Sequence, residues 1–178
     1  MPELVRPHVR FQKSYLAALA EDPDYAQRMT RGAGDLSDED VFARHVDRLL
    51  REAEPGPPRF DGWVPCTTFW WVENDEFLAR VAIRHELKGD LWTVGGHIGY
   101  WVRPSARRRG HGLAAFRAVL PEAAALGIDP ALVTCDWNNE PSRRIIEAGG
   151  GVLENRIGVK LRFWVPTGSV SSLARSRS

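Results

Sequence analysis

Residues 100–113 of the chain read YWVRPSARRRGHGL, and they join a β-rich segment to a segment with helical periodicity. The turn carries two glycines, Gly110 and Gly112, and three consecutive arginines at positions 107–109. The first turn of a helix offers unpaired backbone N–H groups and a positive dipole end, which an anion can approach where no Cβ intervenes. Arginine side chains add charge-assisted hydrogen bonds. This stretch therefore predicts a phosphate-binding loop between a strand and a helix.

Hydrophobic periodicity on both sides of this loop predicts how the rest of the chain folds. Strands are expected at residues 4–9, 64–72, 77–87, 92–102 and 131–135, with a terminal hairpin at 151–165. Helices are expected at residues 11–20, 37–50, 111–126 and 142–148, the first of them broken by Asp22-Pro23. This order predicts a mixed α/β fold, a sheet of about seven strands flanked by about four helices.

A tight strand-to-helix turn with a solvated basic face is the alternative interpretation of residues 107–112. The position of the turn favours a binding site, because ligands of α/β folds gather at the carboxyl ends of strands. The phosphate-binding interpretation is therefore the stronger of the two.

Length and composition predict a single domain. The chain has 178 residues, of which 43% are hydrophobic, and we expect the domain to span residues 1–166. From Thr167 the composition falls to Ser, Arg and Gly, so residues 167–178 are expected to be a disordered tail. The two cysteines, Cys66 and Cys135, lie in apolar stretches away from any Cys or His at ligand spacing, which predicts buried thiols and no metal site.

Charge and hydropathy limit the partners. The net charge of +1 gives no global attraction to nucleic acid or to an anionic membrane, and no basic helix face is evident. The amino terminus has no basic segment leading into an apolar run, and no apolar run approaches the ~18 residues of a transmembrane helix. We therefore expect a cytoplasmic protein without nucleic-acid or membrane partners.

The loop resembles a known signature. Arg107-x-x-Gly110-x-Gly112, preceded by Val102-x-Pro104, is similar to the Gln/Arg-x-x-Gly-x-Gly/Ala motif of the GNAT superfamily of N-acetyltransferases. A later segment, Asn139-x-x-Ser142 followed by Gly149-Gly150, resembles the second motif of that superfamily. The expected order of elements matches its fold from end to end. The phrases at residues 63–68, 83–85 and 95–100 look like a bacterial subgroup of predicted acetyltransferases.

The resemblance implies acetyl-CoA as cosubstrate, lying in an opening between the strand that ends at Val102 and the strand that ends at Cys135. It implies transfer of the acetyl group to the primary amine of a small molecule by direct attack in a ternary complex, in a monomer or a homodimer. The residues implied to hold the cofactor are Tyr100, Trp101, Val102, Arg107, Arg108, Arg109, Gly110, His111, Gly112, Leu113, Asn139 and Ser142.

His97 is the predicted general base, because it lies shortly before Val102 on the strand expected beside the thioester, and its unperturbed pKa of about 6.5 suits removal of a proton from an ammonium group. His85 is the reserve. For both, the alternative is a histidine packed and hydrogen bonded within the sheet. The base is the least constrained part of the mechanism, since holding amine and thioester together contributes most to the rate.

The departing thiolate has no evident proton donor. Ile146 stands where superfamily members often carry a tyrosine that protonates it. The acceptor is equally open, because the tryptophans of the central strands are better explained as sheet core than as an acceptor pocket. Those tryptophans are Trp63, Trp70, Trp71, Trp92 and Trp101. A catalytically silent CoA-binding module, or an acyltransferase with another acyl donor, are the alternative functions.

Overall fold

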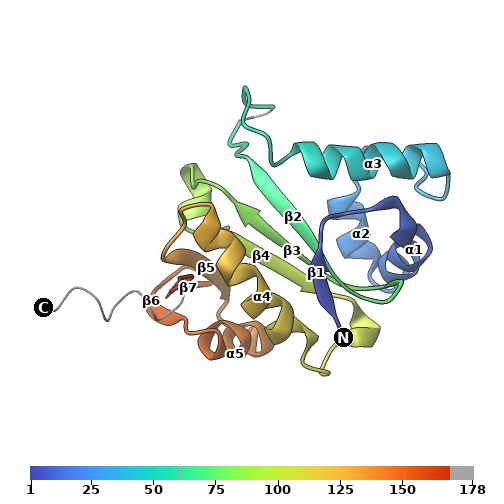
Figure 1. Ribbon diagram of the computed structural model, residues 1–178. Coiled ribbons are helices and arrows are strands. Elements are labelled where there is room, and N and C mark those ends of the chain that lie inside the picture. The colour runs from blue at the N-terminus through green and yellow to red at the C-terminus, as the bar shows by residue number, and fades with distance from the viewer. Residues whose placement is uncertain (60, 169–178) are drawn as a thin grey trace, which may run out of the picture.

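The computed structural model describes residues 1–59 and 61–168, and these form two antiparallel sheets with helices on their faces (Figure 1). The larger sheet has the order β1-β2-β3-β4 and the smaller one β5-β7-β6. The strands are β1 (Glu3–Val5), β2 (Cys66–Glu73), β3 (Glu76–Arg84), β4 (Ile98–Val102), β5 (Ala131–Asp136), β6 (Val152–Ile157) and β7 (Lys160–Val165). The helices are α1 (Gln12–Ala20), α2 (Pro23–Met29), α3 (Glu39–Arg51), α4 (His111–Ala125) and α5 (Glu140–Ala148).

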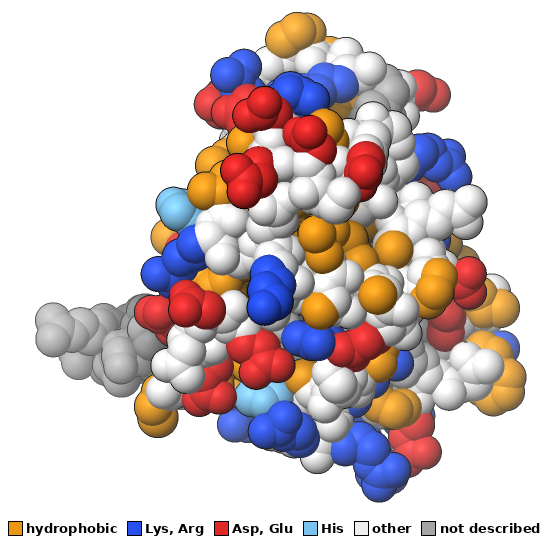
Figure 2. All heavy atoms as spheres, turned by 90° about the vertical axis from the view of Figure 1, so that its right-hand side faces the viewer, with side chains coloured by type: hydrophobic (Ala, Val, Ile, Leu, Met, Phe, Trp, Pro, Cys, Tyr) orange, Lys and Arg blue, Asp and Glu red, His pale blue; other side chains and the backbone are white. Residues whose placement is uncertain are grey.

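Alternation along β2 and β3 divides the apolar residues between two cores, because successive side chains of a strand point to opposite faces. Phe69 and Trp71 pack with α4 and the smaller sheet. Trp70 and Val72 pack with α1, α2 and α3 on the other face. The mixed α/β class is as predicted, and tryptophans of β2 belong to the cores. Figure 2 shows acidic and basic side chains interspersed over the side of the molecule at the right of Figure 1.

The structure has one helix more than predicted. Asp22-Pro23 begins α2 instead of ending helical structure, because the Asp22 carboxylate accepts a hydrogen bond from the Tyr25 N–H (3.1 Å) and proline suits the first helical position. The run expected as one strand over residues 92–102 is shorter. Gly89–Trp92 forms a 3-10 helix, and β4 begins only at Ile98.

The ordered domain extends beyond the predicted boundary. Thr167 is buried, its N–H donates to the Asp129 carboxylate (2.9 Å) and its hydroxyl donates to the Ile128 carbonyl (2.5 Å). Thr167 is therefore part of the domain, which corrects the boundary at residue 166. Residues 169–178 of the predicted tail lie outside the described residues. Within residues 1–59 and 61–168, no helix has the length and hydropathy to cross a membrane.

The core beneath α3 holds a neutral histidine. His45 is buried, with Nε2 at 3.2 Å from the Tyr15 hydroxyl and Nδ1 at 3.2 Å from an Arg48 guanidinium nitrogen. Burial, followed by the charges of Arg48 and Arg80, lowers the pKa of His45 to about 4.

This depressed pKa predicts acid sensitivity. The unfolded chain binds a proton on His45 near pH 6.5, whereas the folded chain does so only near pH 4. The free energy of unfolding should therefore fall as the pH drops through this window, by at most about 1.4 kcal/mol per pH unit from this one group. Urea unfolding of the wild type and of His45→Gln across this window measures the difference. A stability difference that does not change with pH would contradict the assignment.

Candidate functional site

The two sheets are joined at the start of β4, and β4 and β5 diverge from this junction. The His97 N–H donates to the Leu132 carbonyl (2.7 Å), and the Leu132 N–H donates to Nδ1 of the His97 ring (2.9 Å). At the adjacent Gly96 a Cβ would lie 2.5 Å from the Leu132 carbonyl oxygen, so only glycine fits there. From this junction β4 and β5 run in the same direction without further ladder pairing between them. An opening between their carboxyl ends follows.

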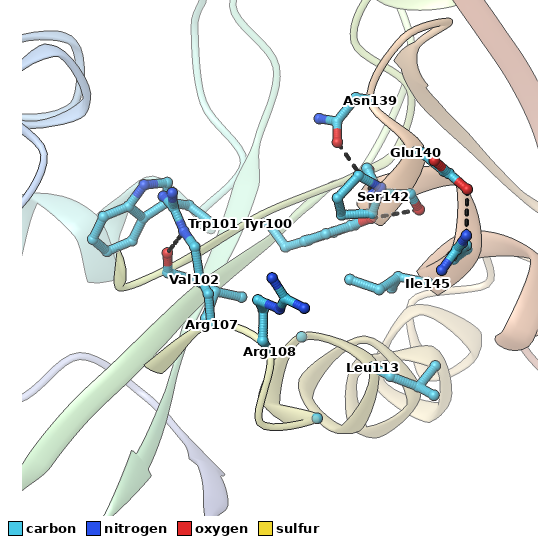
Figure 3. A pocket seen from close by; sticks show the side chains of 14 residues that line it. Tyr100, Trp101, Val102, Arg107, Arg108, Leu113, Asn139, Glu140, Ser142 and Ile145 are labelled. Atoms are coloured by element: carbon cyan, nitrogen blue, oxygen red, sulfur yellow. Dashed lines mark hydrogen bonds and ion pairs between the residues drawn. The ribbon is translucent and has the colours of Figure 1, made fainter. Parts of the chain in front are cut away.

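A cleft of about 850 Å³ lies at this open end (Figure 3). One wall is β4 with the loop that leads to α4, and the other is the first two turns of α5, which follows β5. The lining residues are Tyr100, Trp101, Val102, Arg107, Arg108, Gly110, Gly112, Leu113, Asn139, Glu140, Pro141, Ser142, Arg144 and Ile145.

The loop before α4 presents backbone donors and arginines. Arg108 and Gly110 have left-handed backbone conformations, with φ of 61° and 84°. The first helical hydrogen bond joins the Ala114 N–H to the Gly110 carbonyl (3.0 Å), so the N–H groups of the three preceding residues lie before the helical ladder. The Arg107 side chain folds back on the Val102 carbonyl (Nε to O, 2.9 Å), and that of Arg108 points into the cleft (Figure 3). The geometry suits a polyphosphate anion.

The opposite wall is tied to β4 by a hydroxyl pair. The Tyr100 hydroxyl lies 2.6 Å from the Ser142 hydroxyl and donates to the Ser142 carbonyl (3.2 Å), so it spans the cleft from β4 to α5 (Figure 3). Asn139 caps α5 by accepting the Ser142 N–H (3.2 Å). Burial raises the pKa of Tyr100 to about 12, so this phenol stays protonated near neutrality.

Gly112 has a packing role that the sequence did not reveal. A Cβ there would lie 2.8 Å from Cδ1 of Ile145 and 3.3 Å from Cγ2 of Val102. Its small size lets the first turn of α4 approach both cleft walls, whereas a Cβ on Gly110 would meet no atom within 4 Å. Of the two glycines, Gly110 is therefore the one that leaves open space before the helix.

Most of the predicted cofactor residues lie together in the cleft, but Arg109 and His111 do not line it. Nδ1 of His111 accepts a hydrogen bond from the Trp71 indole (3.4 Å). The cleft also takes in residues that the motifs did not single out, namely Glu140, Pro141, Arg144 and Ile145. Helical spacing supplies a signal for Ile145, which stands one turn after Ser142.

The predicted catalytic histidines lie outside the cleft lining. The lone pair on Nδ1 of His97 is engaged by the Leu132 N–H, and burial followed by the charge of Arg84 lowers the pKa of this ring. His85 contacts the Thr67 hydroxyl through Nε2 (2.7 Å). In the part of the chain that the structure describes, no group of three or more His, Cys, Asp or Glu side chains is arranged to hold a metal ion.

Comparison with known proteins assigns the chain to a family. A family model for the GNAT acetyltransferase domain matches residues 5–152. This chain belongs to the GNAT acetyltransferase family. It is accordingly an acyl-CoA-dependent N-acetyltransferase with acetyl-CoA as its cosubstrate. Comparison with curated protein sequences gives no significant match.

Solved structures share the fold at low sequence identity. Mycobacterium smegmatis RimJ in complex with CoA-disulfide has a TM-score of 0.64 at 18% identity, covering 98% of this chain and 84% of that one. A Salmonella typhimurium acetyltransferase that modifies the N-terminal serine of ribosomal protein L7/L12 has a TM-score of 0.56 at 13% identity, covering 92% of both chains. Campylobacter jejuni PseH in complex with acetyl coenzyme A has a TM-score of 0.55 at 8% identity, covering 94% of this chain and 100% of that one.

The loop geometry predicts that Arg108 binds cofactor at a cost in backbone strain. Arg108→Gly should keep the folded state as stable or stabilise it by up to about 1 kcal/mol, because glycine adopts the left-handed conformation freely. The same change should weaken CoA binding roughly tenfold to hundredfold through the lost charge-assisted hydrogen bonds. Calorimetry with CoA and urea unfolding measure the two effects.

Arg109→Ala is the matched control, because it removes the same charge from the same loop but from a side chain that does not line the cleft. We expect its CoA affinity to stay within a few-fold of the wild type, since an exposed charge acts only through screened solvent. Equal losses in Arg108→Gly and Arg109→Ala would contradict a specific contact at Arg108.

Proposed function

We propose that this enzyme transfers the acetyl group of acetyl-CoA to a primary amine by direct attack within a ternary complex. The cleft between the diverging carboxyl ends of β4 and β5 is the observation that carries the proposal. The loop from Arg107 to Leu113 would hold the pyrophosphate through backbone N–H groups and arginines. The pantetheine would lie along Tyr100–Val102, with Asn139 and Ser142 on the far wall.

Positioning is the main contribution of this site to the rate. Holding amine and thioester in reactive contact supplies effective molarity worth ~7–11 kcal/mol of the barrier. The carboxylate in the cleft lining is that of Glu140, and it forms an ion pair with Arg144 near the surface. No histidine or unpaired carboxylate of the described residues faces the cleft, so the attacking amine would lose its proton to water.

Tyr100 supplies the hydroxyl that the later motif lacks. Ile146 is fully buried and carries no proton, whereas the Tyr100 O–H lies in the cleft wall and remains protonated. In the transfer the amine nitrogen bonds to the carbonyl carbon, the carbon–sulfur bond breaks, and negative charge develops on sulfur. The Tyr100 hydroxyl would turn its one proton from the Ser142 carbonyl toward sulfur and stabilise that charge, and the thiolate would finally take a proton from water.

His97 is proposed as a structural residue in place of the general base that the sequence predicts. Removal of a proton through Nε2 would require the tautomer with the proton on Nδ1, which breaks the contact with the Leu132 N–H. Its lowered pKa also makes it a weaker base.

The acceptor proposed first is the amine of a small molecule, as the resemblance implies. A protein amino terminus is the second candidate, because the Salmonella typhimurium acetyltransferase that shares this fold modifies the N-terminal serine of a ribosomal protein.

Release of free CoA thiol from acetyl-CoA tests the proposal. Incubation with a panel of small amines and with peptides bearing a free amino terminus should give amine-dependent thiol release with at least one class. Binding of acetyl-CoA without release from any acceptor would indicate a silent CoA-binding module. Faster release from propionyl-CoA or succinyl-CoA than from acetyl-CoA would indicate a different acyl donor.

The role of Tyr100 predicts a selective kinetic defect. Tyr100→Phe should lower kcat roughly tenfold to hundredfold while KM for acetyl-CoA changes little, because the lost hydrogen bond forms mainly in the transition state. His97→Ala should instead lower the unfolding temperature and leave the turnover per folded molecule unchanged. Retention of full kcat in Tyr100→Phe would leave water as the sole partner of the leaving thiolate.

A further inference from the structure

A cation without an acidic partner lies on the sheet face that packs against α1, α2 and α3. Arg80 is in the middle of β3, directly opposite Trp70 of β2 and Trp101 of β4 in the strand register. Residues directly opposite one another in neighbouring antiparallel strands share a face of the sheet. Arg80 therefore lies on the face occupied by Trp70 and Trp101, turned away from α4.

The guanidinium of Arg80 is poorly satisfied. It is half-buried, its NH2 donates to the Thr68 hydroxyl at 3.3 Å, and the Tyr25 hydroxyl is a second hydrogen-bonding neighbour. It forms no ion pair with a carboxylate of residues 1–59 and 61–168. Arg103 and Arg162, with side chains only 13% and 11% exposed, each bond a carboxylate, Glu21 and Glu154 respectively. A guanidinium has five N–H donors, so most of those on Arg80 remain available.

Trp70, which lies opposite Arg80 in the strand register, also has a donor without a hydrogen-bond acceptor among the described residues. The indole N–H of Trp70 is buried and has no acceptor among the described residues. A buried donor left unpaired destabilises the folded state, and a buried charge left unpaired destabilises it more. Trp70 is fully buried, so of the two groups only the partly exposed guanidinium of Arg80 could be reached by an anion from outside the chain.

The position of Arg80 connects it with the transfer site. Trp101, its partner in the register, lines the cofactor cleft, and neighbouring strands lie about 4.8 Å apart. Ala82 and Gly99 are the next pair on the same face, and the Arg84 side chain lies over Gly99, where a Cβ would be 3.7 Å from its NH1 atom. A molecule held at Arg80 therefore lies across one strand from the cleft wall.

We propose that Arg80 binds an anionic group, a carboxylate or a phosphate, of the amine that receives the acetyl group. The acceptor is then a zwitterionic amine whose anion anchors on β3 while its amino group reaches across β4 toward the thioester. This inference rests on the proposed function, and it narrows the acceptor class from any amine to amines that carry an acid.

Matched pairs of acceptors test the charge preference. Phenylalanine is compared with phenylalaninamide, and phosphoethanolamine with ethanolamine, by thiol release from acetyl-CoA. The wild type should favour the anionic member of at least one pair roughly tenfold to hundredfold in kcat/KM. The pair that shows the preference distinguishes a carboxylate from a phosphate.

Arg80→Met should bring this ratio close to one and leave calorimetric affinity for acetyl-CoA unchanged. Its unfolding temperature without ligand should be equal to or above that of the wild type, because a half-buried charge without a carboxylate partner has been removed. A structural arginine would give the opposite shift in stability.

Arg84→Met is the control on the same strand and face. The Arg84 guanidinium already bonds the carbonyls of Gly95 (3.3 Å) and Gly96 (3.1 Å). Its loss should lower the unfolding temperature and preserve the preference for the anionic acceptor.

Binding of the anion is also measured without turnover. Inorganic phosphate, and separately acetate, are titrated while the unfolding temperature is followed, since a ligand that binds only the folded state raises it. A rise in the wild type that is absent in Arg80→Met supports the anion site even if no amine releases thiol, in which case only the proposed function fails. Equal rates for anionic and neutral acceptors in the wild type, or a preference that survives in Arg80→Met, overturn the inference while leaving the acetyltransferase intact.

Discussion

The junction between His97 and Leu132 is the contact on which the site depends. Both backbone groups of Leu132 are satisfied by one residue, the carbonyl by the His97 N–H and the N–H by Nδ1 of its ring. Gly96 permits the close approach, since any Cβ there would strike the Leu132 carbonyl. Because no ladder pairing joins β4 to β5 beyond this junction, the two strands are free to diverge from it. The cleft is the direct result.

Two contacts connect the diverging walls of the cleft. The Tyr100 hydroxyl reaches across to Ser142 and ties β4 to the first turn of α5, while Gly112 lets α4 pack against Ile145. These contacts set the spacing of the walls without filling the space between them. On the proposed function, a site built this way would work chiefly by holding two reactants in place, because its walls supply hydroxyls and backbone N–H groups and offer no histidine from the described residues.

The two faces of the larger sheet carry different groups. The face under α4 carries the apolar core behind the loop of residues 107–113. The opposite face holds Trp70, whose indole N–H has no acceptor among the described residues, and Arg80, which bonds the Thr68 hydroxyl. On the proposed function, donor and acceptor would approach the same open strand, β4, from different sides. The arginine loop and Arg80 would then bind different anions, that of the cofactor and that of the acceptor.

Short-range patterns in the sequence were enough to predict the loop, the mixed α/β fold and the family, because glycine spacing, arginine clustering and hydrophobic periodicity all act within a few residues. Tertiary structure alone decided the roles that depend on distant partners. His97 meets Leu132 across 35 residues of chain, Thr167 meets Asp129 across 38, and Tyr100 meets Ser142 across 42. The sequence also could not show that Arg80 has no carboxylate partner among residues 1–59 and 61–168, because only folding decides which acids lie beside an arginine.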